Sequence, residues 1–578
     1  MLGKYFSKGK KEDFYLPGEE IKIGKSIRNY TRERDPLSTC KNRLALAAMG
    51  FLAVYLVLTV RLFDVCISGD YVARREDAQA AQIKIMTSNP IKRADILDRN
   101  GTILATSLPT VNLYANPGKI FNPKKTAAAL SRILPELKYE SIYRKLTSNS
   151  KFVYIKRNLT PSQQYQINYL GVPGLEFENG EKRIYPHKNL FAHILGSTNI
   201  DNVGVSGIEK ELNDRLTESD IPLRLTIDAG VQDTIRIHLA EAVKKFNAVG
   251  ATAILMDTNS SEIIAMVSLP DFDPNKPINP SSKALFNMAT KGVYEPGSVL
   301  KIFNTAMSLD SGKVRVADKF DATEPLKLKY DTIKDYRGEN RWLSVPEILV
   351  YSSNIGSARM ALKVGGGEQK DFMEKIGFFD ELNIEVAEKG RPIKPHSWHE
   401  GTIATVAFGY GLAVTPLHVV TAFSAVVNGG VYHQPTLLKR AQKDDGKRII
   451  SYNTSKSMRD LLRLVVVEGS GKRANIMGYE VAGKTGTAQK LSDDGKYVNK
   501  KVRTTFVATF PVSNPRYSLL LMMDEPKATK ETWGFVTSGW NTVPTAGKLI
   551  ADLAPQLNVK ANYDLDELRR NRIIEAAY

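Results

Sequence analysis

The chain has 578 residues, of which 42% are hydrophobic and 25% charged, an ordinary balance for a folded protein of more than one domain. Eighty Lys and Arg against 62 Asp and Glu give a net charge of +18, which favours an anionic partner such as a membrane surface or an acidic polymer. No nucleic-acid-binding module is recognisable. The two cysteines, Cys40 and Cys66, form no C-x-x-C pair, which excludes a disulfide framework or a thiolate metal site.

The first predicted element is a membrane-spanning helix over residues 44–63. Residues 44–60 carry no charge, and Arg43 and Arg61 bracket them. At about 1.5 Å per residue this run is just short of a hydrocarbon core of about 30 Å, and the arginines can snorkel to the surface. Its length favours an anchor over a signal peptide, and a buried soluble helix is the alternative. Residues 1–43 hold eleven Lys and Arg against six Asp and Glu, which predicts a cytoplasmic tail with the rest of the chain outside the inner membrane.

Residues 295–301 read EPGSVLK and begin a stretch with helical apolar periodicity. Ser298 would lie at the N-terminal end of this helix, and Lys301, three residues on, would share its face. A serine hydroxyl needs a neighbouring base to act as a nucleophile, and a lysine becomes a base only when its pKa falls. The same spacing at Ser7, Ser38 and Ser148 is interpreted as polar surface, and a solvated helix cap is the alternative for Ser298.

Residues 352–354 read SSN and precede a helix-like run over 355–362. Ser352 and Asn354 would therefore lie on a loop leading into a helix, where a capping role is the alternative to a chemical one. The S-x-N pattern alone is common and also occurs at Ser197 and Ser451.

Residues 478–490 read GYEVAGKTGTAQK and match both a phosphate-binding loop and the K-T-G of penicillin-interacting enzymes. A phosphate loop requires a helix to begin at Lys484, but the following residues lack a helical period and contain a turn signal at 493–495. Strands at about 479–490, 502–512 and 516–523 in immediate succession predict an antiparallel meander. A nucleotide hydrolase is therefore rejected. Lys484 could instead lower the pKa of Lys301 and bind an anionic substrate group.

The ordered set Ser298, Ser352 and Lys484 resembles the class B penicillin-binding proteins, the membrane-anchored peptidoglycan D,D-transpeptidases. Further blocks carry the resemblance: residues 93–101, with Ala94 in place of the usual glycine, and residues 183–186, 193–196, 204–209, 225–228, 256–275, 408–411 and 428–430. The SSNIG and KTGTAQK stretches look more like the cell-division branch than the elongation branch.

The resemblance implies a role for each site residue. Ser298 would attack the D-Ala-D-Ala terminus of a stem peptide, with Lys301 as its base, Ser352 as proton relay and Asn354 as a contact to the substrate backbone. Lys484 and Thr485 would bind the terminal carboxylate, Gly486 would let the strand approach the substrate, and the Thr487 N–H would complete an oxyanion hole with that of Ser298. β-Lactams would trap Ser298. No cofactor is implied, and His396 and His399 lack a third ligand, so no metal is predicted.

The implied fold is an α/β (α+β) transpeptidase domain over 226–560, with an antiparallel sheet flanked by helices. A tail over 1–43, the span over 44–63 and an elongated β/α+β non-catalytic (dimerisation-type) domain over 64–225 precede it, and a tail over 561–578 follows. Implied partners are peptidoglycan stem peptides, β-lactams, a polytopic membrane glycosyltransferase and other division proteins. The alternatives are a D,D-carboxypeptidase or β-lactamase of the same fold, and a division scaffold whose catalysis is dispensable.

Overall fold

The computed structural model describes residues 36–67 and 93–563, except for 277, 278, 280, 330, 441–444 and 492–496. The chain divides into two compact units, Met1–Pro90 and Ile91–Tyr578. Residues 1–35 and 564–578 of the predicted tails, and the predicted turn at 493–495, lie outside the described residues.

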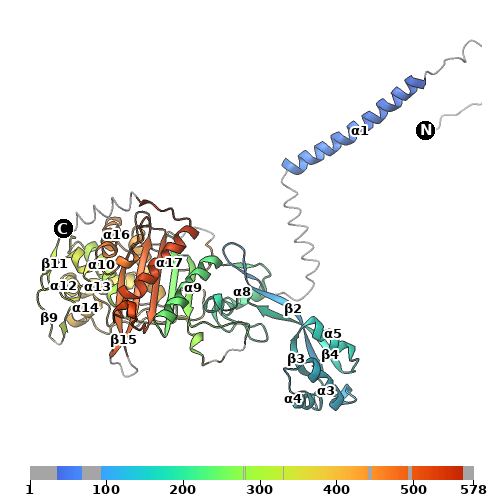
Figure 1. Ribbon diagram of the computed structural model, residues 1–578, viewed down its shortest axis with the longest axis horizontal. Helices are drawn as coiled ribbons and strands as arrows, with labels where there is room; N and C mark the ends of the chain where they lie inside the picture. Colours follow the sequence, from blue (N-terminus) through green and yellow to red (C-terminus); the bar gives the residue numbers. More distant parts are fainter. Residues whose placement is uncertain are drawn as a thin grey trace, which may run out of the picture. The chain divides into compact units, whose positions relative to one another are not determined.

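In the first unit, α1 (Pro36–Ile67) is a single helix of 32 residues (Figure 1). Its segment Ala45–Leu62 has a mean hydropathy of 2.0. Eighteen residues at about 1.5 Å each reach about 27 Å, close to the thickness of a hydrocarbon core. Within the described ranges, α1 is the one helix long and apolar enough to cross a membrane, which agrees with the predicted span in length and composition.

The second unit begins with a five-stranded sheet of order β3-β2-β1-β5, in which β4 also pairs with β2. Its strands are β1 (Ile96–Leu97), β2 (Ile103–Ala115), β3 (Val153–Leu159), β4 (Leu175–Ile184) and β5 (Leu223–Arg224). A turn at Asn100 and Gly101 joins β1 to β2, and the Asp98 carboxylate accepts the N–H groups of Asn100 at 2.8 Å and Thr102 at 2.7 Å.

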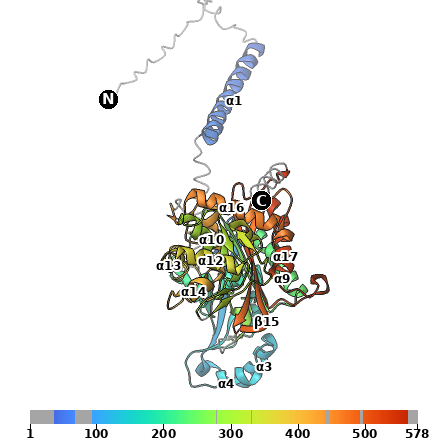
Figure 2. The ribbon, with the colours of Figure 1, turned by 90° about the vertical axis from the view of Figure 1, so that its left-hand side faces the viewer.

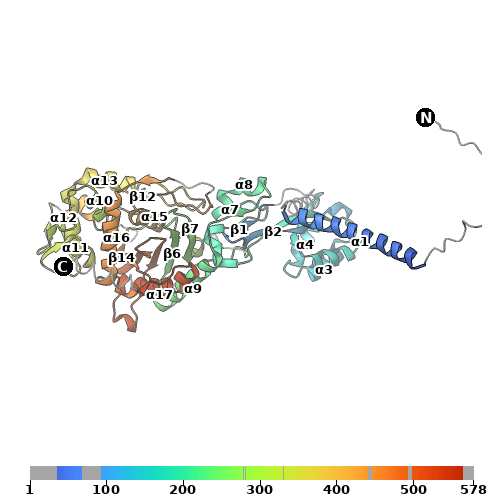
Figure 3. The same ribbon diagram turned by 90° about the horizontal axis from the view of Figure 1, so that it is seen from above.

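Three helices cover one end of the long strands β2 and β4: α3 (Pro123–Ile133), α4 (Tyr139–Leu146) and α5 (Pro161–Tyr169) (Figure 1). Leu130, Ile142 and Ile167 from these helices pack on Leu113 and Ile155 of the sheet in a hydrophobic core of their own. The short helices α6 (Ala192–Leu195), α7 (Gly207–Glu211) and α8 (Asn213–Glu218) then lead toward a second, C-terminal sheet (Figure 3).

The C-terminal sheet is fully antiparallel, with strand order β14-β15-β16-β6-β7. It consists of β6 (Gly250–Asp257), β7 (Ile263–Leu269), β14 (Ala482–Leu491), β15 (Tyr497–Phe510) and β16 (Tyr517–Asp524). The predicted meander is confirmed. Lys484 lies inside a strand, opposite Val507, so the phosphate-loop alternative is excluded by the structure.

Helices cover both faces of this sheet because its buried strands carry apolar side chains on both sides. Ala253 and Leu255 of β6 pack against α9 (Ala229–Lys245) and α17 (Thr542–Gln556), whereas Ile254 and Met256 face α10 (Leu300–Asp310) and α15 (Pro416–Val427). In Figure 2, α9 and α17 lie on one side of the sheet and α10 on the other. The remaining helices are α11 (Val345–Val350), α12 (Asn354–Val364), α13 (Gly366–Lys375), α14 (Glu400–Val406) and α16 (Tyr452–Val467). Short strands are β8 (Lys319–Asp321), β9 (Leu326–Lys327), β10 (Thr332–Ile333), β11 (Trp342–Ser344), β12 (Val431–Tyr432) and β13 (Lys447–Arg448).

The β1 end of the N-terminal sheet and the C-terminal part share one hydrophobic core. Ile96, Phe191 and Ile208 belong to the same buried cluster as Ile254 and Leu520. A buried ion triad lies at this junction, where the Glu209 carboxylate binds Arg93 Nε and Arg183 Nε, each at 2.7 Å. The second unit is therefore held together across the predicted boundary at residue 225.

Candidate active site

Ser298 lies in a single 3-10 turn, η5 (Gly297–Val299), directly before α10. Gly297 begins the turn with a φ of 57°, a left-handed value that glycine adopts without strain. Its N–H donates to Gly409 O at 3.2 Å, and a Cβ on Gly409 would lie only 2.0 Å from Gly297 O. The backbone of residues 408–411, which read FGYG, thus packs directly on the backbone of the turn that carries Ser298.

Lys301 is fully buried one turn further along, and its Nζ lies among four oxygen atoms. Two are carbonyl oxygens that can only accept: Ser352 O at 2.5 Å and Asn354 Oδ1 at 2.8 Å. The other two are the hydroxyl oxygens of Ser298 and Ser352, both at 3.1 Å. A neutral lysine amine has two N–H bonds, and the two carbonyls use both. Its lone pair is then left facing the hydroxyls, which is the arrangement of a base beside a nucleophile.

Lys484 of β14 brings a second buried amino group to the same place. Its Nζ donates to Ser352 Oγ at 3.0 Å and to Thr485 O at 3.2 Å. Burial lowers the pKa of Lys484 to about 7. Burial first, and then the Lys484 cation, hold the pKa of Lys301 well below its usual range. Lys301 is therefore the amine favoured in its neutral form, and Lys484 the one that can carry charge for an anion.

Ser352 lies in a turn with a φ of 57°, an uncommon value for a residue other than glycine. Its neighbour Ser353 is the N-cap of α12 and accepts the Gly356 N–H at 3.0 Å. The capping role considered for Ser352 and Asn354 thus belongs to Ser353. The side chains of Ser352 and Asn354 instead reach Lys301.

The other three predicted residues, Thr485, Gly486 and Thr487, continue along β14. Thr485 Oγ1 lies 2.6 Å from Ser470 Oγ, and Thr487 Oγ1 accepts the Ser538 N–H at 3.2 Å. A Cβ on Gly486 would lie 2.9 Å from Pro296 O and 2.8 Å from Val299 Cγ2. Glycine at this position lets β14 pack directly on the turn that carries Ser298.

The structure thus brings five predicted residues into one hydrogen-bonded cluster, which we call the serine cluster: Ser298, Lys301, Ser352, Asn354 and Lys484. Thr485, Gly486 and Thr487 flank it: the Thr485 carbonyl accepts from Lys484 Nζ, and the Thr485 and Thr487 hydroxyls contact groups outside the cluster.

Sequence reasoning missed Glu295, which binds two segments to the turn that carries Ser298. Its carboxylate accepts the Gly411 N–H at 2.8 Å and the Tyr497 hydroxyl at 3.2 Å, and burial raises its pKa. The EPGS stretch contained this acid, but a partner at the start of β15 cannot be read from local spacing.

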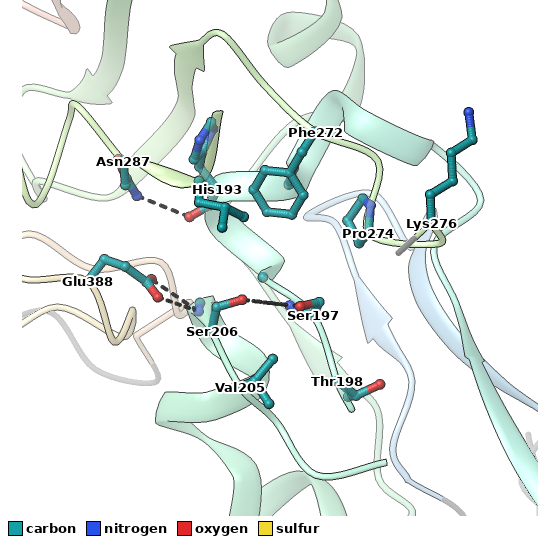
Figure 4. A pocket seen from close by; sticks show the side chains of 14 residues that line it. His193, Ser197, Thr198, Val205, Ser206, Phe272, Pro274, Lys276, Asn287 and Glu388 are labelled. Atoms are coloured by element: carbon teal, nitrogen blue, oxygen red, sulfur yellow. Dashed lines mark hydrogen bonds between the residues drawn. The ribbon is translucent and has the colours of Figure 1, made fainter. Parts of the chain in front are cut away.

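A cavity of about 560 Å³ shares no lining residue with the serine cluster. In Figure 4, Asn287 Nδ2 donates to His193 O at 3.1 Å, and the Glu388 carboxylate accepts the Gly207 N–H at 3.1 Å. His193 Nε2 lies 2.7 Å from Ala284 O. These contacts join the segment around α6 and α7 to the loop after β7 and to the segment between α13 and α14, so the cavity belongs to the junction between the two parts of the unit.

The chain matches the family model "Penicillin binding protein transpeptidase domain" over residues 251–538 and "Penicillin-binding Protein dimerisation domain" over residues 88–221. It is 35% identical to the probable peptidoglycan D,D-transpeptidase FtsI of Caulobacter vibrioides, over 82% of each chain. It is 30% identical to the probable peptidoglycan D,D-transpeptidase PenA of Neisseria gonorrhoeae, over 85% of this chain and 89% of that one. Its fold is similar to penicillin-binding protein 3 of Mycobacterium tuberculosis, solved in complex with aztreonam, with a TM-score of 0.66 and 22% identity over 82% of this chain and 98% of that one.

The two family models, the relatives and the shared fold agree with the resemblance of the motifs. The chain therefore belongs to the class B penicillin-binding proteins, on the FtsI (septal) side of that family.

Proposed function

We propose that this protein is a peptidoglycan D,D-transpeptidase of the division septum, which cross-links stem peptides through an acyl-enzyme on Ser298. One observation carries the proposal: two buried lysine amines converge on the Ser352 hydroxyl, and one of them, Lys301, also reaches Ser298. Relatives named as D,D-transpeptidases support the same chemistry. β-Lactams acylate the same hydroxyl because they imitate the D-Ala-D-Ala terminus.

In the first step, Ser298 Oγ attacks the carbonyl carbon of the penultimate D-alanine while Lys301 Nζ takes its proton. The C–N bond to the last D-alanine then breaks, and its amine needs a proton. Ser352 Oγ, 3.1 Å from Lys301 Nζ and 3.0 Å from Lys484 Nζ, is placed to relay that proton. The amine of a neighbouring stem peptide later attacks the ester carbonyl, displaces Ser298 Oγ and forms the cross-link.

Asn354 has a positioning role in this mechanism. Its Oδ1 accepts from Lys301 Nζ at 2.8 Å, and its Nδ2 donates to Lys334 O at 2.9 Å. These contacts fix the side-chain amide so that an acceptor faces the lysine. The second N–H of Nδ2 remains for the substrate backbone.

The substrate peptide binds along β14. This strand pairs with β15 on one side and is the edge of its sheet, so an extended peptide can add as a further strand. Lys484 and Thr485 then bind the terminal carboxylate. The N–H groups of Ser298 and Thr487 hold the developing oxyanion, and each such donor is typically worth about 10²- to 10³-fold in rate.

The cell context follows from the N-terminal half. We place α1 in the inner (cytoplasmic) membrane as a single anchor, with residues 1–43 in the cytoplasm, because basic flanks stay on that side. Residues 64–225 form the non-catalytic domain and residues 226–560 the transpeptidase domain. A polytopic membrane glycosyltransferase and other division proteins contact α1 and the non-catalytic domain.

The test is labelling of the full-length chain with a fluorescent penicillin. Ser298→Ala is expected to abolish the label, because no acyl ester can form. Ser148→Ala is the matched control: Ser148 also precedes a lysine by three residues, but it lies just after α4 and its hydroxyl donates to Lys145 O. A label that survives Ser298→Ala contradicts the proposal.

The reaction type is decided by the products. With pentapeptide glycan strands, cross-linked dimers and free D-alanine are expected, and both should disappear in Ser298→Ala. Free D-alanine without dimers would indicate a carboxypeptidase. Rapid hydrolysis of many penicillin molecules by each enzyme molecule would indicate a β-lactamase. Normal septation in a Ser298→Ala strain would favour the scaffold alternative.

A further inference from the structure

Residues 334 and 335 lie outside the serine cluster and hydrogen-bond to one of its members, Asn354. Asp335 follows β10, and its Oδ1 accepts the backbone N–H groups of Asn354 at 2.5 Å and Ile355 at 3.0 Å. Its Oδ2 accepts the Ser353 hydroxyl at 2.7 Å. The carboxylate thus binds three donors at the N-terminal end of α12, where a negative charge is favoured.

The same segment sets the direction of the Asn354 side chain. The neighbouring carbonyl, Lys334 O, accepts from Asn354 Nδ2 at 2.9 Å. With its N–H group bound there and its backbone held by Asp335, the amide of Asn354 turns Oδ1 toward Lys301 Nζ at 2.8 Å. Residues 334 and 335 therefore place one of the four oxygen atoms that surround Lys301 Nζ.

Asp335 also acts on Lys301 through its charge. The groups that contact Lys301 Nζ, namely Ser298, Ser352 and Asn354, are uncharged. Two charged groups act on it: the Lys484 ammonium, which lowers the pKa of Lys301 in addition to burial, and the Asp335 carboxylate, which raises it. Asp335 therefore opposes the effect of Lys484.

We propose that Asp335 is a positioning residue of the acylation step, which holds Asn354 and the Ser352 turn toward Lys301 and offsets the Lys484 charge there. The inference rests on the proposed function and adds a residue to it. The hydrogen bonds of Asp335 go to Ser353, Asn354 and Ile355 and not to Ser298, so Asp335 acts through Asn354 and Lys301.

The experiment is the pH profile of penicillin acylation, measured as the second-order rate constant on the full-length chain between about pH 5 and about pH 9. In Asp335→Asn, Oδ1 can still accept the two backbone N–H groups and Nδ2 can donate to Ser353 Oγ, so the cap is kept while the charge is lost. Without the carboxylate the pKa of Lys301 falls further, so the neutral amine persists to lower pH. The acid limb of the profile, where the rate constant rises with pH as Lys301 loses its proton, is expected to move to lower pH by at least about half a unit.

Two further variants separate charge from geometry. Asp335→Glu keeps the charge but displaces it, so its rate should fall by about tenfold or more while its acid limb stays near that of the unmodified chain. Asp335→Ala loses both, so it should show the lower rate and the shifted limb together. If Asp335→Asn folds poorly, as judged by thermal unfolding, the comparison of Asp335→Glu with Asp335→Ala still decides.

Asp228→Asn is the matched control, because Asp228 caps α9 by accepting the N–H groups of Gly230 at 3.0 Å and Val231 at 3.1 Å. It should leave the profile unchanged. An acid limb that stays in place in both Asp335→Asn and Asp335→Ala would reduce Asp335 to a helix cap and overturn the inference. Failure of the proposed function itself would look different, because the unmodified chain would not be acylated at any pH.

Discussion

Ser352 combines a left-handed backbone with the hydroxyl on which both lysines converge. A φ of 57° destabilises a non-glycine residue by about 1 kcal/mol or more. We expect the Ser352→Gly variant to be more stable than the Ser352→Ala variant by about 1 kcal/mol in free energy of unfolding, because glycine adopts this φ without strain. Both variants lack the hydroxyl, and penicillin acylation should be severely reduced in both. Equal unfolding temperatures for the two variants would argue against backbone strain at this position.

Lys484 gives the acylation rate a second dependence on pH. Its pKa of about 7 lies below the usual value for lysine, so the ammonium is present below about pH 7 and is lost as the pH rises through it. The rate constant for a penicillin bearing a carboxylate should therefore decline above about pH 7. In Lys484→Arg the side chain stays charged, so this alkaline limb should move upward. If the rate constant of the Lys484→Arg variant declined at the same pH as that of the unmodified chain, a group other than Lys484 would cause the decline.

At the level of secondary structure, the contact of β14 with the nucleophile turn depends on Gly486. In Gly486→Ala the added Cβ would meet Pro296 O at 2.9 Å, so strand and turn must separate. We expect acylation to slow by about 10²-fold, since misplacement by about 1 Å at a reacting centre has effects of that size. Gly367→Ala in α13 is the control, because nothing lies within 4 Å of its added Cβ. Penicillin labelling rates on folded protein test both variants, and a Gly486→Ala rate close to that of the control would contradict the packing argument.

The elements that sequence could predict are those defined by local patterns. The hairpin of β14 and β15 follows from the missing helical period after Thr485, and the SSN turn follows from the helix that begins beside it. Boundaries were less accurate: the predicted strand from 479 begins at Ala482, and Ser298 lies in a 3-10 turn before α10. The contacts of Glu295 with Tyr497 and of Asp335 with Asn354 could not be predicted. They join segments whose proximity only the tertiary fold creates.

For the whole second unit, the junction triad is expected to control stability. Glu209→Ala would leave Arg93 and Arg183 buried without their carboxylate, and loss of one partner in such a pair typically destabilises by about 3–5 kcal/mol. Because one hydrophobic core crosses the junction, the N-terminal sheet and the transpeptidase part should unfold at a lower temperature together. Calorimetry of the full-length chain measures this.

Glu211→Ala is the control for that change. Glu211 pairs with Lys389 at 2.7 Å nearer the surface of the molecule, so its loss should alter stability by no more than about 1 kcal/mol. Two separate transitions in Glu209→Ala, with the transpeptidase transition unmoved, would contradict a shared core.

The central claim is that Ser298 is the acylated nucleophile, and peptide mapping by mass spectrometry tests it most directly. Cleavage after Lys291 and Lys301 releases residues 292–301, GVYEPGSVLK, which contain Ser298. After brief exposure to penicillin, one adduct on this peptide, located on the serine, is predicted. An adduct on residues 342–359, which contain Ser352, or an unmodified 292–301 peptide in fully labelled protein, would contradict the account.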